Sequence, residues 1–117
     1  MPKLTAMPAS KKPALISPEQ LRKHIGGACA LLKALANEDR LILLCHLAAQ
    51  RRNVGELEAI TGIRQPTLSQ QLAVLRQEAV VETEKEGKYV YYRLANDDAV
   101  RIMRTLWNIY CSPNRRG

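Results

Sequence analysis

The chain has 117 residues, of which 46% are apolar and 25% charged, a composition typical of one small globular domain and not of a disordered chain. Its 18 lysines and arginines outnumber 11 aspartates and glutamates, and the resulting net charge of +7 favours a polyanionic partner, above all nucleic acid. No apolar run is long enough to span a bilayer, and residues 1–18 lack the apolar core of a signal peptide, so we expect a cytoplasmic protein without a membrane partner.

Residues 1–16 hold three of the six prolines and three lysines, which predicts a flexible basic tail. A single domain then follows over residues 17–112, and residues 113–117 form a short C-terminal tail. In the domain's first helix, Ser17 can act as the N-cap, Pro18 fits the first turn and Gln20 can complete a capping box. That helix runs to about Ala36, with apolar residues at helical spacing: Ile25, Ala28, Cys29, Leu32, Leu35 and Ala36.

A second helix is predicted from Asn37, which can cap it, to about Gln50. Its expected inward stripe has the spacing i, i+3, i+4 and i+7: Leu41, Leu44, Cys45 and Ala48. Residues 51–53 then break the helical pattern.

A helix-turn-helix is predicted next. Asn53 caps a short helix over residues 54–61, with Glu56 placed as in a capping box, and Thr61-Gly62 ends it. Its inward residues are Val54, Leu57 and Ile60. Pro66 begins the second helix, over residues 66–77, which carries Leu68, Leu72 and Leu75 on one side.

The other side of this second helix carries polar side chains suited to DNA. Glutamine reads adenine edges, serine and threonine contact bases or phosphates, and arginine suits phosphates. The candidate contacts are Arg64, Gln65, Thr67, Ser69, Gln70, Gln71 and Arg76. Taken alone, this pattern is better explained by an ordinary amphipathic helix with a solvated face, and it is the order of the surrounding elements that decides in favour of DNA binding.

After residue 79 the apolar period changes from helical to two. Residues 80–85 and 88–94 flank Glu86-Gly87, a pattern that predicts a β-hairpin with glycine at its turn. Lys85, Lys88 and Arg93 are charges that such a wing can place over the DNA backbone.

The last predicted helix is capped by Asn96 and ended by Pro113, with an apolar stripe of Val100, Met103, Leu106, Trp107 and Tyr110. The predicted fold is therefore mainly α with a β-hairpin wing, a winged helix-turn-helix in the order α-α-α-α-β-β-α.

Residues 20–112 resemble the ArsR/SmtB family of winged-helix bacterial repressors, through LLKALANEDRLILLCHL, VGELEAITGIRQPTLSQQLAVLRQEAVVETEKEGKYVYYRL and the closing helix. The resemblance implies a homodimer, formed through the first and last helices, that binds a palindromic double-stranded DNA operator until an inducer releases it. Ala79 stands where most relatives have a glycine with left-handed backbone, and Arg64 stands where relatives often have a small capping residue. We therefore expect both ends of the recognition helix to depart from the family pattern.

Metal-sensing relatives carry a Cys-x-Cys in the third helix or Asp and His pairs along the last helix. Here the third helix has no cysteine and the last has no histidine, so we expect neither of these metal sites and no cofactor. Cys45 in the second helix and Cys111 at the end of the last resemble the thiol- and persulfide-sensing, BigR/HlyU-like branch of the family. That resemblance implies a redox switch, in which a disulfide or polysulfide bridge between Cys45 and Cys111 releases the DNA in response to reactive sulfur or an oxidant.

Other interpretations remain open. Cysteine often fills apolar cores, so Cys45 on its stripe, and Cys29 in the core or a dimer seam, could be packing residues. A repressor of the same fold could sense a thiophilic metal or metalloid through the cysteines, or the protein could bind DNA without any effector. An enzyme is disfavoured, because the sequence has no phosphate-binding glycine loop, ligand cluster or base-activated nucleophile.

Overall fold

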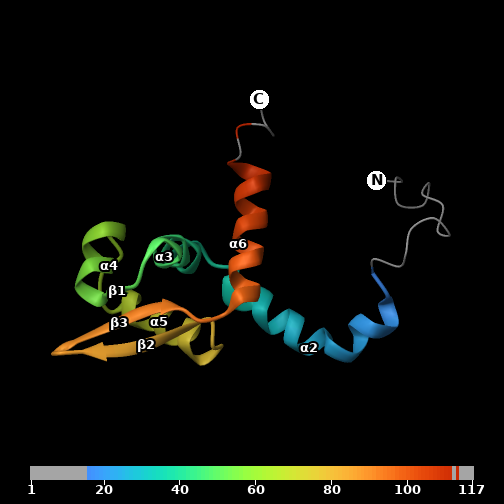
Figure 1. Ribbon diagram of the computed structural model, residues 1–117, viewed down its shortest axis with the longest axis horizontal. Helices are drawn as coiled ribbons and strands as arrows, with labels where there is room; N and C mark the ends of the chain where they lie inside the picture. The colour runs from blue at the N-terminus through green and yellow to red at the C-terminus, as the bar shows by residue number, and fades with distance from the viewer. Residues whose placement is uncertain (1–15, 112, 114–117) are drawn as a thin grey trace.

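The computed structural model describes residues 16–111 and 113, so the predicted tails over 1–16 and 113–117 lie outside it except for Ile16 and Pro113. The elements follow in chain order: α2 (Pro18–Leu35), α3 (Glu38–Ala49), β1 (Arg52–Asn53), α4 (Val54–Thr61), α5 (Thr67–Gln77), β2 (Val81–Glu86), β3 (Tyr89–Leu94) and α6 (Asp97–Tyr110). This order confirms the predicted winged helix-turn-helix (Figure 1). None of the helices in the described ranges is long and apolar enough to cross a membrane.

Four of the helices begin at the predicted caps, where a side-chain oxygen accepts a hydrogen bond from the backbone N–H three residues on: Ser17, Asn37, Asn53 and Asn96. At α4 the capping box is complete, because Glu56 Oε1 also accepts from the Asn53 N–H at 3.0 Å. At α2 the prediction of a capping box is wrong: among the described residues, the return bond from Gln20 is absent.

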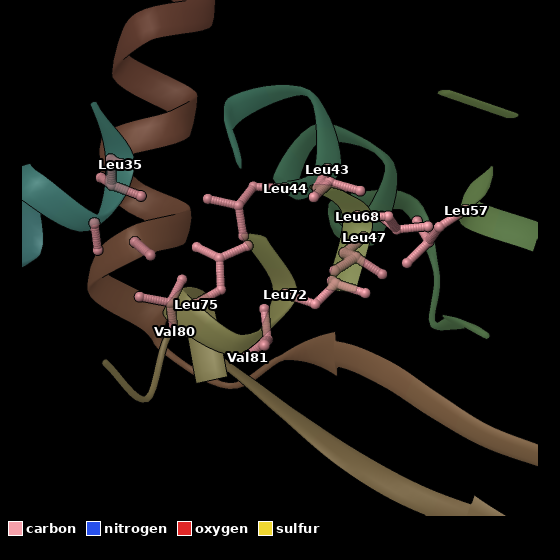
Figure 2. Close-up of a cluster of buried hydrophobic side chains, with 12 residues drawn as sticks. Leu35, Leu43, Leu44, Leu47, Leu57, Leu68, Leu72, Leu75, Val80 and Val81 are labelled. Carbon is pink, nitrogen blue, oxygen red and sulfur yellow. The ribbon is translucent and has the colours of Figure 1, made fainter. Parts of the chain in front are cut away.

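The hydrophobic core lies where α3, α4, α5 and the base of the hairpin meet, and Figure 2 shows the leucines of α3 and α5 pointing toward one another there. Leu68, Leu72 and Leu75 of α5 are at most 1% exposed, as predicted. The complete set of buried apolar residues is Ala34, Leu35, Leu43, Leu44, Leu47, Leu57, Leu68, Leu72, Leu75, Val80, Val81 and Ala99. Replacing one of these leucines with alanine typically costs about 2–5 kcal/mol, so this cluster fixes the position of α5.

The predicted inward stripe of α3 is wrong except for Leu44. The buried residues are Leu43, Leu44 and Leu47, whereas Cys45 and Ala48 are exposed and Leu41 is half-buried. The sequence allows either side of α3 to face the core, because the helix is apolar on two sides. The structure directs one side toward α4, α5 and β3, and the other side, with Leu41, Cys45 and Ala48, toward α6.

The stripes predicted for α2 and α6 are present, but most of their residues do not enter the core. Leu32 is 56% exposed, Trp107 59% and Tyr110 74%, and Cys29 is exposed, so it is not a core residue. Ile60 of α4, also predicted to point inward, is exposed as well. Both α2 and α6 extend away from the winged-helix body (Figure 1), and periodicity identifies an apolar face without identifying what covers it.

The sheet has three antiparallel strands in the order β1-β3-β2. In β1, Arg52 pairs with Tyr92 and Asn53 with Tyr91. This strand was not predicted from the sequence, because two residues are too few to show an alternating pattern. The hairpin is confirmed, but its turn lies one residue later than predicted, at Gly87-Lys88, because Glu86 still pairs with Tyr89. Gly87 has a φ of 64°, which favours glycine.

The end of α5 shows why position 79 matters. Ala79 has a φ of 60°, so it adopts the left-handed backbone that the family pattern places there with glycine, and the expected departure at this end of the helix is wrong. Its N–H donates to the Arg76 carbonyl at 3.0 Å, and the Val80 N–H donates to the Leu75 carbonyl at 2.9 Å. These two bonds form a Schellman motif, and its usual apolar contact is supplied by Leu75 and Val80, both fully buried.

We expect Ala79→Gly to increase the free energy of unfolding by about 1 kcal/mol in urea denaturation. Glycine relieves the strain of a left-handed alanine, about 1–2 kcal/mol, and loses part of this gain to the greater entropy of its unfolded chain. Ala73→Gly, at an exposed position inside α5, is the matched control and should destabilise the protein by about 1 kcal/mol. An Ala79→Gly protein no more stable than the parent would contradict the strain argument.

Candidate nucleic-acid interface and cysteine site

The α5 helix presents a polar outer face above its buried leucines. Ser69, Gln70 and Arg76 on this face are exposed, and Thr67 is half-buried. Arg64 and Gln65, which precede the helix, are also exposed. The candidate DNA contacts in and before α5 are therefore exposed, except for Thr67 and Gln71, which are half-buried.

Two of the candidate glutamines already have partners inside the protein. Gln65 Oε1 accepts a hydrogen bond from the Ser69 N–H at 3.0 Å, at a helix start where Pro66 supplies no side-chain cap. Gln71 Oε1 accepts from Arg40 Nη1 at 2.7 Å. The NH2 group and the second acceptor position of each amide oxygen can still reach an outside partner. Gln70 is exposed, and its side chain has no hydrogen bond to any other described residue.

The wing has two different faces, because side chains alternate along its strands. Glu82, Glu84 and Glu86 share one face, where Arg93 pairs with Glu82 and, at 3.1 Å, with Glu84. Arg51, which precedes β1, pairs with Glu86 and, at 2.7 Å, with Glu84. The charge of Arg93, grouped in the sequence analysis with those of Lys85 and Lys88, is therefore balanced by glutamates on this face.

The opposite face of the wing continues the surface of α5. Thr83 lines a groove together with Arg76, and Tyr92 lines another with Ser69 and Arg76. Lys85 is two residues beyond Thr83 on the same strand face, and Lys88 is in the turn at the tip of the wing. The two lysines thus extend the positive surface that begins at the recognition helix.

Cys45 and Cys111 line one cavity between α3 and α6, although α3 and α6 are far apart in the sequence. Cys45 lies on the outer side of α3, and Cys111 is the C-cap of α6. The cavity has a volume of about 230 Å³, and its other lining residues are apolar or aromatic: Leu41, Met103, Leu106, Trp107 and Tyr110. Both cysteines are free thiols.

The cavity changes the acidity of one thiol. Partial burial and, to a smaller extent, the nearby Cys111 raise the pKa of Cys45. At neutral pH Cys45 is therefore protonated, and since the thiolate is the reactive form, its reactivity increases as the pH rises.

Cys29 lies apart from this pair. It lines a separate cavity of about 520 Å³ between α2, α3 and α5, together with Lys33 and Arg40. Within residues 16–111 and 113, no three His, Cys, Asp or Glu side chains gather as a group that could hold a metal ion. The structure thus groups the two cysteines of the predicted switch and separates the third.

Two arginines that the sequence did not single out link α3 to α5 and the end of α3 to the wing. Arg40, in the first turn of α3, bonds to Gln71 of α5, and Arg51, just after α3, binds the glutamates of the wing. A signal for Arg40 was available, because a cation is unfavourable in the first turn of a helix and its presence there needs an explanation.

Comparisons with known proteins agree with this geometry. Residues 37–83 match the family model described as bacterial regulatory protein, arsR family. A biofilm growth-associated repressor of Agrobacterium fabrum is 50% identical over 93 residues, which cover 80% of each chain. The crystal structure of the transcriptional repressor BigR from Xylella fastidiosa is similar with a TM-score of 0.77 and 41% identity, over 83% of this chain and 99% of that one. The structure of reduced HlyU from Vibrio cholerae is similar with a TM-score of 0.74 and 38% identity, over 80% of this chain and 99% of that one.

We expect Cys111→Ser to lower the pKa of Cys45, because the substitution removes a neighbouring group that can become negative. Iodoacetamide should then alkylate Cys45 faster at any pH below its pKa. The rise of the alkylation rate with pH should move to lower pH, but it should still lie above that of an ordinary thiol, because Cys45 stays partly buried. Quantifying the labelled peptides by mass spectrometry measures this, and Cys29 in the same sample is the control, because it lies in another cavity. An unchanged Cys45 profile would show that the two thiols do not interact.

Proposed function

The chain belongs to the arsR family of bacterial regulatory proteins, and from this premise we propose that it is a dimeric repressor released from its operator when Cys45 and Cys111 become covalently bridged. It is a DNA-binding transcription regulator and not an enzyme. The observation that carries the proposal is the shared cavity, which brings these two thiols together from α3 and α6. One of the similar solved structures is of HlyU in a reduced state, which agrees with a role for thiol chemistry.

DNA recognition is assigned to α5 and the wing. In this proposal α5 lies in the major groove, where Thr67, Ser69 and Gln70 meet base edges and Arg64 and Arg76 meet phosphates. Gln65 and Gln71 are oriented by hydrogen bonds that their oxygens accept within the protein, and they add contacts through their NH2 groups and the second acceptor position of each oxygen. Lys85 and Lys88 extend the contact along the backbone.

The second copy of the chain covers the apolar faces of α2 and α6. Leu32, Trp107 and Tyr110 leave a large apolar surface open in a single chain, as is typical of an interface. Two-fold symmetry then places two α5 helices about 34 Å apart, one turn of DNA, on a palindromic operator.

In this proposal the chemistry begins at Cys111, the exposed C-cap of α6, and the partly buried Cys45 reacts second. With an organic persulfide, the Cys111 thiolate takes the outer sulfur and releases the donor as a thiol. Cys45 then attacks the inner sulfur of the Cys111 persulfide, expels hydrogen sulfide and closes the disulfide. A second sulfur transferred before closure gives a polysulfide bridge instead. With a peroxide, Cys111 becomes a sulfenic acid, which Cys45 converts to a disulfide with loss of water.

The bridge acts on DNA binding through α3. Bridging draws the end of α6 toward one side of α3, and the leucines on the other side of α3 pack against α5. A shift of α3 therefore moves the recognition helices away from the spacing that the operator requires.

Treating the protein with an organic persulfide or peroxide should join Cys45 to Cys111 and weaken operator binding at least about fivefold. Intact-mass spectrometry and a DNA mobility assay measure the two effects. Cys29→Ser is the matched control and should respond like the parent. The Cys45→Ser and Cys111→Ser variants should keep their operator affinity after the same treatment. Bridged protein that binds as tightly as reduced protein would refute the mechanism.

Gln70→Ala should weaken binding to the preferred sequence about tenfold and binding to random DNA much less, since a base contact contributes about 1–3 kcal/mol of discrimination. Lys88→Ala should weaken binding to all sequences alike and reduce the dependence of log affinity on log salt by about one unit. Equal losses on every sequence for Gln70→Ala would argue against base reading by this residue.

A further inference from the structure

Arg40 joins three segments of the protein through one guanidinium group. Its Nε–H donates to the Ala34 carbonyl oxygen at 2.6 Å, and Nη2 donates to the Lys33 carbonyl oxygen at 2.9 Å. Its Nη1 donates to Gln71 Oε1 on α5 at 2.7 Å. One side chain of α3 thus bonds to the end of α2 and to the recognition helix.

These bonds answer a need at the end of α2. The last carbonyl groups of a helix have no partner inside the helix, and they attract positive charge. The planar guanidinium is suited to several acceptors at once, because its five donors point in fixed directions. Since a cation in the first turn of α3 is unfavourable for α3 itself, its contacts outside α3 explain its position.

We propose that Arg40 is a positioning residue for DNA recognition, which holds α5 at a fixed orientation to α2 through Gln71. The proposal rests on the proposed function, in which α5 reads the operator and α2 belongs to the dimer interface. It assigns to Gln71 a structural role in addition to any contact that its amide N–H makes with DNA.

The attachment of α2 makes this link consequential. Ala34 and Leu35, in its last turn, are its buried residues, and the N-terminal part of the helix extends away from the body (Figure 1). The direction of α2 therefore depends on a few contacts at this end, two of which are the Arg40 hydrogen bonds. A change in the angle between α2 and α5 would alter the spacing of two recognition helices in a dimer, which matters on a palindromic operator and little on random DNA.

The test compares Arg40→Lys, Gln71→Met and the double variant on a duplex selected by the parent protein from random-sequence DNA. Lysine keeps the positive charge of Arg40 but lacks the planar guanidinium with its several fixed donors. Methionine keeps the length of the Gln71 side chain but lacks the amide oxygen that accepts the hydrogen bond. Each single variant should weaken binding to the selected duplex about tenfold, with unchanged salt dependence and unchanged affinity for random DNA. The double variant should bind about as well as the weaker single variant, because both remove the same bond.

Arg101→Lys, at a 77% exposed position of α6, is the matched control and should bind like the parent. Urea unfolding of each variant shows whether it is folded, and should Arg40→Lys fail to fold, Gln71→Met removes the same bond from the other side.

Additive losses in the double variant would overturn the inference, because they would mean that Arg40 and Gln71 act separately. A loss on all sequences with a weaker salt dependence would also overturn it, because Arg40 would then be a phosphate contact. If the parent selects a sequence and both single variants bind it as tightly, the Arg40 inference alone fails. If the parent selects no sequence, the proposed function fails and the inference fails with it.

Discussion

The contact between the leucines of α3 and those of α5 is the interaction on which the rest of the structure depends. Leu43, Leu44 and Leu47 meet Leu68, Leu72 and Leu75 in a close-packed core, so α5 cannot rotate without breaking that packing. This fixes which side of α5 faces outward, and the residues on that side are mostly polar. The same contact turns the other side of α3, with Cys45, toward α6. The polar outer face of α5 and the thiol cavity are therefore consequences of one interface.

Features that depend on neighbouring residues were predictable from the sequence. The caps at Ser17, Asn37, Asn53 and Asn96 are local, and the structure confirms them. The phase of α3 was not predictable, because a helix that is apolar on two sides fits two orientations and tertiary packing decides between them. The grouping of Cys45 with Cys111 came from the family resemblance, since spacing along a chain does not show which helices meet.

The roles of the charged residues likewise depend on tertiary packing. The net charge of +7 predicted a polyanionic partner, but a sum cannot locate its members. The fold pairs Arg51 and Arg93 with glutamates on one face of the wing, and it directs Arg40 to carbonyl groups and an amide inside the protein. Arginines that look equivalent in the sequence thus differ in role according to the acceptors within reach.

The left-handed alanine at position 79 has a mechanical consequence. It stands between α5 and β2, where a glycine would let the backbone adopt a wide range of angles. The Cβ of alanine confines this joint to a narrow region of conformations, and the Schellman bonds on either side confine it further. The angle between α5 and the wing is therefore restricted, so a movement of α5 together with its core also displaces Lys88 at the tip of the hairpin. Ala79, although unfavourable for stability, thus makes α5 and the wing move together.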